Sequence, residues 1–531
     1  MDKNTIIGLV IIALILVGYS YFMQPSKEEI RAMEIRDSIA RVEARQRAEA
    51  EKQRQEAYEL AQSQKQEAIS SVFRQDSLQE QTFTLENNKI KLRIDSKGGR
   101  VSHVELKDYR THDSLPLVLW QEKTSEMYLS FYALNRQINT NELIFVPGEG
   151  NTGFSADSTR QLTMRAYVED DKYLEFTYRL APDTYMVDFS INAHNLNDII
   201  ASNTNFLTLH WDVEMPQLEK SKEFENRYTG VYYNFTDGEV ESLSPTSDES
   251  EELSTGVKWI AYKQQFFSSV LIAQEPFDNA HVSSNTSTTV GYLKNASSEI
   301  ALPYTGKAIE QYDMQFFFGP NSYPVLRDYD KQYKNSHGEE IYLHKLVDLG
   351  WKWIAWFNRY IVIPIFNFLE ANVTRNYGLI IFLLTLIVKL ILSPLTYKSY
   401  LSQAKMRVLK PQVDEINKKI PADRAMERQQ AMMKLYKQAG VNPMGGCLPL
   451  LLQMPILIAL FYFFPGAIEL RQKSFLWAKD LASYDSIATL PFNIPFYGDH
   501  VSLFCLLMTA TNIIYMIMNQ KNQPQNDQMK G

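Results

Sequence analysis

Long polar stretches of this chain are interrupted by a few segments that are almost entirely apolar. Residues 5–22 carry no charged side chain, and three more apolar segments occupy residues 376–397, 447–464 and 501–519. Each is long enough to cross a hydrocarbon core as a helix, although the last two are near the lower limit. Core helices of a soluble protein are the alternative, and four such segments disfavour it. The pattern predicts an α-helical integral membrane core, a bundle of several spans.

The first apolar segment is predicted to be an uncleaved signal anchor, residues 1–23. A cleavable signal peptide is the competing interpretation, and it would have a shorter apolar region followed by small residues at a cleavage site. Tyr19, Tyr21, Phe22 and Met23 stand at that place instead. These bulky residues favour the anchor.

Residues 80–338 change to a period of two, which is typical of half-buried strands. In KIKLRID (89–95), the side chains of Ile90, Leu92 and Ile94 share one face, and pairs of Asn and of Gly on either side mark turns. The same alternation recurs between turn signals further along. We expect a large all-β sandwich with a core of its own.

Two segments connect this domain to the membrane. Residues 24–79 are rich in Glu, Arg, Gln and Ala, which predicts a charged helical linker. Residues 339–375 crowd aromatic side chains beside Lys352 and Arg359, and such side chains next to a span lie at the headgroup level. We predict an interfacial amphipathic helix there; a core helix of the sandwich is the alternative. The aromatic residues are Trp351, Trp353, Trp356, Phe357 and Tyr360.

The charges of the loops predict the orientation. Residues 398–438 carry ten Lys or Arg against four acids, whereas residues 466–500 carry three against four. By the positive-inside rule the first of these stretches is cytoplasmic. Counting spans from it places the N-terminus and the tail (520–531) in the cytoplasm, and residues 24–375 and the 465–500 loop outside it.

The basic stretch is predicted to form a cytoplasmic helical hairpin, residues 398–446, with a break at Pro421 and a stop at Gly440. Three roles suit its surface. It contacts anionic lipid headgroups, or the RNA and proteins of a translating ribosome, or it is a solvated pair of helices that only sets topology. The basic residues concerned are Lys405, Arg407, Lys410, Arg424 and Arg428.

Composition disfavours several classes of function. The formal net charge of −8 argues against a nucleic-acid binder. The two cysteines, Cys447 and Cys505, both lie in apolar segments, so no disulfide framework is expected. The eight histidines show no metal-ligand spacing, and the sequence contains no phosphate loop or Gly-x-Ser-x-Gly motif. We therefore expect no cofactor, no metal site and no enzymatic activity.

Lys389 is an unusual residue for an apolar span. A lysine at the centre of a membrane helix costs roughly 2.5–3.5 kcal/mol on insertion scales. It precedes the cytoplasmic end of the span by about 12 Å, so its ammonium could snorkel to the interface. The other interpretation is that Lys389 faces a water-filled cavity. Thr385 lies one turn away on the same face, and Gln453 and Asn512 offer polar groups on the third and fourth spans. The second, third and fourth spans contain no acid that would neutralise Lys389.

Several long motifs are similar to the YidC/Oxa-type membrane protein insertases. In the membrane part they are LIVKLILSPLT, AKMRVLKPQVDEI, LYKQAGVNPMGGCLPLLLQMPILIALFYFF and IELRQKSFLWAKDL. The upstream stretches IKLRIDSKGGRVSHVELKDY and GVKWIAYKQQFFSSVLI resemble the large periplasmic domain of the Gram-negative YidC branch.

The resemblance implies an inner-membrane protein that inserts, folds and helps to assemble nascent membrane proteins, alone or with the Sec translocon. It also implies a hydrophilic, positively charged groove, with Lys389, Thr385 and Gln453 at groove positions. The basic hairpin would work near the targeting machinery and the ribosome, and the periplasmic domain would be a super-sandwich. No nucleotide hydrolysis is expected.

The sequence departs from this family in two places. The basic groove residue is usually arginine, and Lys389 keeps its charge but lacks the planar fork. Family members of this branch have six spans, whereas this sequence stops twelve residues past the fourth, so we expect it to be truncated at its C-terminus. One rival function is a small-solute channel or transporter with a periplasmic sensing domain, for which the sequence lacks repeated membrane halves. The other is a membrane-tethered sugar-binding or sugar-modifying sandwich.

Overall fold

The computed structural model describes residues 51–54, 70–75, 78–134, 136–148, 158–421, 424–440, 448–495 and 497–522. The predicted first span, most of the charged linker and the end of the tail lie outside the described residues. The chain divides into two compact units, Met1–Val72 and Phe73–Gly531. The second unit contains the β domain and the helices that follow it.

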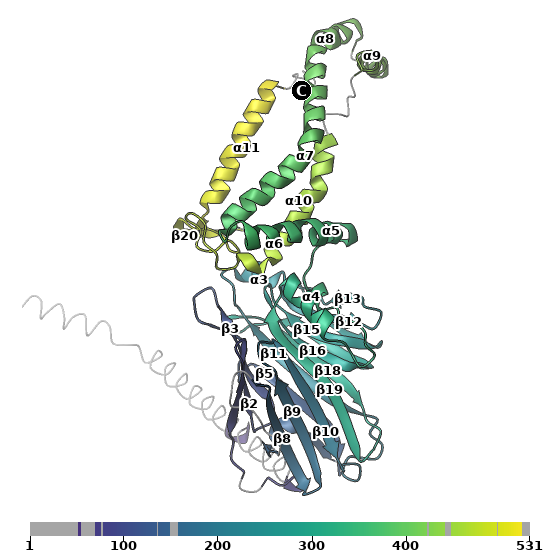
Figure 1. Cartoon of the computed structure of the whole chain (residues 1–531), viewed down its shortest axis with the longest axis vertical. Helices are drawn as coiled ribbons and strands as arrows, with labels where there is room; N and C mark the ends of the chain where they lie inside the picture. The colour runs from purple at the N-terminus through teal and green to yellow at the C-terminus, as the bar shows by residue number, and fades with distance from the viewer. Residues whose placement is uncertain are drawn as a thin grey trace, which may run out of the picture. The chain divides into compact units, whose positions relative to one another are not determined.

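The β domain consists of three antiparallel sheets, drawn from purple to teal in Figure 1. A nine-stranded sheet has the order β13 (Val240–Ser242), β12 (Gly230–Phe235), β15 (Val257–Lys263), β16 (Phe267–Phe277), β19 (Ile309–Pro320), β10 (Met186–His194), β9 (Lys172–Leu180), β8 (Arg160–Glu169) and β7 (Val146–Pro147). A six-stranded sheet has the order β14 (Glu249–Leu253), β17 (Asn279–Thr286), β18 (Tyr292–Pro303), β11 (Phe206–Pro216), β5 (Ser125–Ala133) and β6 (Arg136–Asn139). The third contains β1 (Thr82–Glu86), β2 (Ile90–Asp95), β3 (Val101–Arg110) and β4 (Pro116–Trp120).

The alternation in the sequence builds the core between these sheets. Ile90, Leu92 and Ile94 on β2 are fully buried, as their spacing predicts. Trp120 lies in the core, with its ring 5.8 Å from that of Trp211 and its indole N–H donating to a serine hydroxyl of β16. Buried aromatic pairs of this kind add to the stability that burial alone gives. The prediction of a large all-β sandwich is confirmed.

The β domain extends beyond its predicted boundaries at 80 and 338. At its start, Phe73 is buried, and the Gln75 amide oxygen accepts from the backbone N–H of Ile144 at 2.7 Å. At its end, Ile341 is buried and its carbonyl accepts from the indole of Trp259 at 2.6 Å. The predicted interfacial helix therefore does not begin near 339, because the apolar residues there cover the core of the sandwich.

The helical part begins after the last long strand. Its elements are α4 (Tyr323–Gln332), the 3₁₀ turn η2 (Leu343–Leu346), α5 (Lys352–Phe357), the π turn η3 (Asn358–Val362), α6 (Ile363–Asn372), α7 (Tyr377–Val408), α8 (Lys410–Lys419), α9 (Ala425–Gln438), α10 (Leu448–Gly466), the 3₁₀ turn η5 (Ile468–Leu470), the ribbon strands β20 (Ala488–Ile494) and β21 (Gly498–Val501), and α11 (Leu503–Asn522). Within the β domain, two short elements are η1 (Thr140–Glu142) and α3 (Lys222–Asn226).

Helices α5 and α6 are joined by the π turn into one helical segment. Its outer side exposes Trp353, Trp356 and Tyr360, whereas Ile354 is buried. On the inner side, the buried Asn358 amide donates to the carbonyls of Leu349 and of Ala459 on α10, at 3.1 and 2.9 Å. The segment is thus amphipathic and fixed to α10, as an interfacial helix requires.

Helix α7 continues through Pro394, although the predicted second span ends at 397 and the basic hairpin was expected to begin at 398. Proline removes the N–H that would bond the carbonyl of Leu390. The hydroxyl of Ser393 donates to that carbonyl at 2.8 Å and replaces the missing bond. Serine and threonine commonly satisfy freed carbonyls in membrane helices in this way. The span and the first part of the predicted hairpin are therefore one helix.

By length and composition, one described helix can cross a membrane: Tyr377–Pro394, with a mean hydropathy of 2.2. Shorter apolar stretches cover Gln453–Gly466 on α10 and Leu503–Met518 on α11. Part of the predicted third span lies outside the described residues. The predicted number of spans therefore stays a prediction.

Candidate functional site

Lys389 lies on an exposed side of α7. Ile380, Leu384 and Val388 form the buried side of this helix, which packs in one hydrophobic cluster with α6 and α10. Lys389 follows Val388 by one residue, a rotation of about 100° around the helix. Thr385, four residues earlier, is also exposed. The structure therefore brings the two predicted groove residues of α7 onto one accessible face.

Within the described residues, Lys389 makes no ion pair or hydrogen bond. Thr385 donates its hydroxyl hydrogen to the carbonyl of Ile381 at 2.8 Å, which leaves its oxygen free to accept. The face thus offers one cation and one acceptor. A polar segment of another chain that entered it would meet groups that can exchange water for protein contacts.

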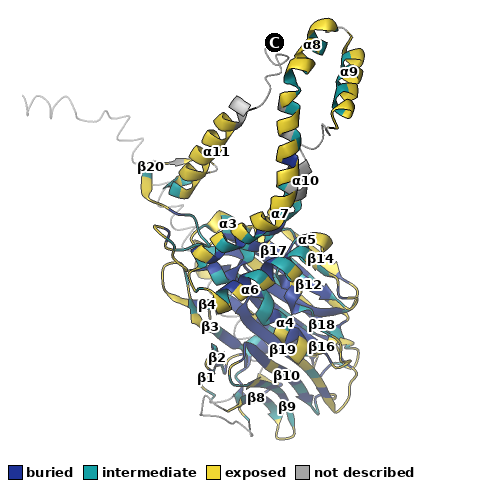
Figure 2. Cartoon of the chain, turned by 45° about the horizontal axis from the view of Figure 1, so that its top comes forward, coloured by how far each residue is buried: buried dark blue, intermediate teal, exposed yellow. Residues whose placement is uncertain are grey.

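The two remaining predicted groove residues lie on other helices. Gln453 on α10 is half-buried, and Asn512 on α11 is exposed. The hydrophobic cluster that joins α6, α7 and α10 contains no residue of α11, and in Figure 2 α11 is coloured as exposed along most of its length. Among the described residues no hydrogen bond connects Asn512 to Thr385, Lys389 or Gln453, so the structure does not assemble all four into one site.

The predicted basic hairpin is built by the end of α7 and by α8 and α9, which lie on either side of Pro421. Arg428 has a structural role that its charge did not reveal: its guanidinium donates to the carbonyls of Asn417 and Ile420, both at 2.8 Å. It therefore fastens α9 to the end of α8. Gly440 ends α9 with a φ of +62°, a conformation that suits glycine.

The other basic residues of the hairpin differ in their surroundings. Lys405 is exposed, Lys410 is half-buried at the start of α8, and the side chain of Arg407 lies outside the described residues. Arg424 is exposed and lies 3.6 Å from Glu427. An exposed pair of this kind contributes little to stability, so Arg424 is available to a partner.

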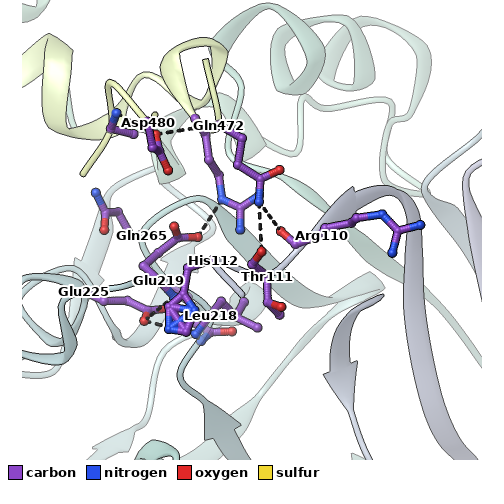
Figure 3. A network of polar contacts seen from close by, with 12 residues as sticks. Arg110, Thr111, His112, Leu218, Glu219, Glu225, Gln265, Gln472 and Asp480 are labelled. Carbon is purple, nitrogen blue, oxygen red and sulfur yellow. Dashed lines mark hydrogen bonds and ion pairs between the residues drawn. The ribbon is translucent and has the colours of Figure 1, made fainter. Parts of the chain in front are cut away.

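A polar junction fastens the loop after α10 to the β domain, and the sequence analysis did not predict it. Its centre is an ion pair between Arg471 Nε and Glu219 Oε1, 2.6 Å apart, with side chains 2% and 9% exposed. Gln472 donates to the backbone carbonyls of Arg110 and Thr111 at 3.1 and 2.9 Å. Figure 3 shows these contacts converging from three separate stretches of the chain.

Two further contacts of the junction hold the end of α10. The Gln265 amide donates to the carbonyl of Pro465 at 2.9 Å, which satisfies one of the free carbonyls at a helix C-terminus. The hydroxyl of Ser322 donates to Glu469 at 3.0 Å. The one local signal for these contacts is that Glu469 and Arg471 follow an apolar span directly, since charged residues there need partners.

Burial raises the pKa of three acids in and around the junction. It raises the pKa of Glu225, which lies fully buried beside Glu219, to about 8. Burial also raises the pKa of Glu219, against the opposing effect of Arg471, and the pKa of Glu469. Desolvation disfavours the charged form of each carboxyl group. The junction thus places two carboxyl groups, those of Glu219 and Glu225, in the electrostatic field of the Arg471 guanidinium.

We predict that the junction weakens as the pH rises. The pKa of Glu225 is about 8 in the folded state, above its ordinary value of 4.5. The stability that it contributes is therefore complete below pH 4.5 and lost as the pH rises through about 8. Thermal unfolding of the full chain should show a melting temperature that falls over this range.

The variant Glu225→Gln removes this titrating group and should flatten that fall. Glu223→Gln is the matched control, because Glu223 is an exposed acid on the same short helix, α3. It should keep the pH dependence of the native chain. If Glu225→Gln and the native chain show the same dependence, Glu225 does not titrate in this range.

Two family models together match most of the chain. The YidC periplasmic domain matches residues 82–364, and the 60Kd inner membrane protein family matches residues 368–531. Two curated relatives, both named membrane protein insertase YidC, come from Parabacteroides distasonis and Bacteroides fragilis. They are 43% and 42% identical to this chain, with the alignments covering 100% of it and 86% and 85% of the relatives.

Among solved structures, an active YidC insertase is similar over 77% of both chains, at 19% identity and a TM-score of 0.27. That similarity is too low to support an argument of its own. The family models and the two curated relatives decide the assignment. This chain belongs to the YidC family of membrane protein insertases.

Proposed function

We propose that this chain inserts membrane proteins into the inner membrane and that the exposed face of α7 around Lys389 receives the segment that crosses. Membership of the family supports the activity. The observation that supports the site is the exposure of Lys389 inside the apolar stretch Tyr377–Pro394, where the described residues supply no counter-ion. A cation costs free energy at such a position, and residues of this kind usually face water or a substrate.

The mechanism follows from elementary energetics. A short polar segment of a substrate enters the hydrated face of α7 around Lys389. It avoids the full free-energy cost of transfer into hydrocarbon, because its polar groups keep hydrogen-bond partners. Lys389 attracts acidic side chains of that segment. The apolar helix of the substrate then moves into lipid and gains about 0.8 kcal/mol for each CH₂ group it buries. This burial drives the reaction, and Lys389 and Thr385 lower its barrier.

The orientation and the partners are part of the proposal. The N-terminus and the α8–α9 hairpin face the cytoplasm, where Lys405 and Arg424 meet the ribosome, the targeting machinery or anionic headgroups. The β domain faces the periplasm. Nascent membrane proteins are the substrates, delivered directly or through the Sec translocon. The junction keeps the β domain and the span helices together during this process.

Site-specific crosslinking tests the proposed site. Photoreactive residues at 385, 389 and 453 of the full chain should capture a single-span nascent substrate. Position 391 is the control, because Ile391 is 63% exposed but points about 160° away from Lys389 on the helix. Capture at 391 equal to that at 389 would place the substrate elsewhere.

A further inference from the structure

The two strands β20 and β21 form a ribbon (residues 488–501) with an exposed apolar bulge. Its register changes from Thr489↔His500 to Ile494↔Gly498, so residues 490–493 stand opposite Asp499 alone. Phe492, in this bulge, is 61% exposed. A two-stranded ribbon is marginally stable in water, and clustered exposed apolar residues indicate an interaction surface. The exposed bulge is therefore a candidate surface for binding.

The ribbon is attached directly to the first turn of α11. Asp485 accepts from the backbone N–H groups of Leu503 and Phe504 at 2.8 and 3.1 Å and so caps this helix. It also accepts from the indole N–H of Trp477 at 2.9 Å, and the ring of Trp477 lies 4.5 Å from that of Phe504. Only Ser502 separates β21 from α11, and Figure 1 places β20 at the base of this helix.

A stack of three rings also holds the ribbon to the chain that precedes it. The His500 ring stacks between Tyr484 and Tyr497, with centroids 4.0 and 4.9 Å away. Lys220 of the β domain lies 3.8 Å from the centroid of Tyr484. These contacts fix the direction of the ribbon relative to α11 and to the β domain.

The chemistry of the ribbon fits a lipid surface. Residues 486–502 contain no Lys or Arg and one acid, Asp499, so attraction to a charged partner is weak. Besides Phe492, the described residues of the ribbon include two less exposed apolar side chains, those of Ile494 and Tyr497. Aromatic residues next to a span lie at the membrane–water interface. Trp477, whose ring packs against Phe504 in the first turn of α11, is another residue of this kind.

We propose that the β20–β21 ribbon docks on the lipid of the outer leaflet and inserts Phe492 below the headgroups. This proposal rests on the proposed topology, in which α11 crosses the membrane. The ribbon then acts as a second interfacial anchor, in addition to α5. It sets the depth at which α11 enters the bilayer, because both leave the same capped turn at Asp485.

Depth-dependent fluorescence quenching tests the proposal on the full chain in phosphatidylcholine vesicles. In a background with Cys447 and Cys505 replaced by alanine, a polarity-sensitive label is attached to a single cysteine at 492, 507 or 309. Leu507 reports the α11 span itself. Ile309 is a matched control, an exposed apolar residue at the far end of β19, about 37 Å along the strand from the junction.

We expect nitroxide lipids labelled near the headgroup to quench position 492 several-fold more than position 309, and iodide in the water to do the reverse. Lipids labelled deep in the acyl chain should quench position 507. If 507 is quenched but 492 behaves like 309, the ribbon proposal is wrong and the topology stands. If 492 is shielded from both quenchers, protein covers it, and the lipid assignment is also wrong. An unquenched 507 overturns the topology instead.

Discussion

The variant Lys389→Ala is expected to insert substrates with an acidic translocated segment on the order of tenfold more slowly than the native chain. Two unit charges 4 Å apart interact by about 4 kcal/mol at an effective dielectric constant of 20, and partial hydration reduces this to a tenfold effect or somewhat more. Lys389→Arg should keep most of the activity, because the charge is retained. Insertion of a radiolabelled single-span substrate into proteoliposomes, followed by protease protection, measures the rate.

Two controls separate this effect from a general change in charge. Lys398→Ala removes a lysine nine residues further along the same helix, beyond the apolar stretch, and should leave the rate nearly unchanged. A substrate whose acidic residues are replaced by amides should be inserted at similar rates by the native chain and by Lys389→Ala. If Lys389→Ala and Lys389→Arg are both fully active, the side chain only snorkels to the interface.

The variant Arg471→Ala is expected to loosen the attachment of the β domain to the helices that follow it. Removing one partner of a buried ion pair typically costs about 3–5 kcal/mol, because the other charge stays buried without compensation. Glu219 would be left in that state, 9% exposed. The full chain in detergent should melt at a lower temperature, and protease should cut the 471–485 loop faster.

Arg424→Ala is the matched control for this prediction. Its pair with Glu427 is exposed, with side chains 65% and 58% accessible, and exposed pairs contribute about 0–1 kcal/mol. The double variant Arg471→Ala with Glu219→Gln should recover part of the loss, since the unpaired carboxylate is gone. Equal melting temperatures for Arg471→Ala and Arg424→Ala would show that the junction does not depend on the buried pair.

The sequence predicted what depends on local pattern. Ile90, Leu92 and Ile94 are buried because alternation alone decides which face of a strand is apolar. Lys389 could be singled out because a charge inside hydrocarbon is costly whatever surrounds it. The family resemblance, which rested on long contiguous motifs, is confirmed by the family models.

What the sequence could not predict depends on distant contacts. Arg471 and Glu219 are 252 residues apart, and nothing in either neighbourhood indicates the other. The continuation of α7 beyond Pro394 depends on the hydroxyl of Ser393, which pattern rules treat as an ordinary polar residue. The placement of Asn512 depends on how α11 packs, and helical period alone does not determine this.

Helix α7 is long and continuous, so a movement at one of its ends is felt at the other. Its 32 residues span about 48 Å. At one end Gly378 packs closely enough against the ring of Phe475 that an added Cβ would lie 2.1 Å from it. A tilt of about 5° around that point displaces Val408 by about 4 Å. In the proposed topology, a load on the hairpin at the cytoplasmic side is transmitted along α7 to the loop that holds Phe475, next to the junction.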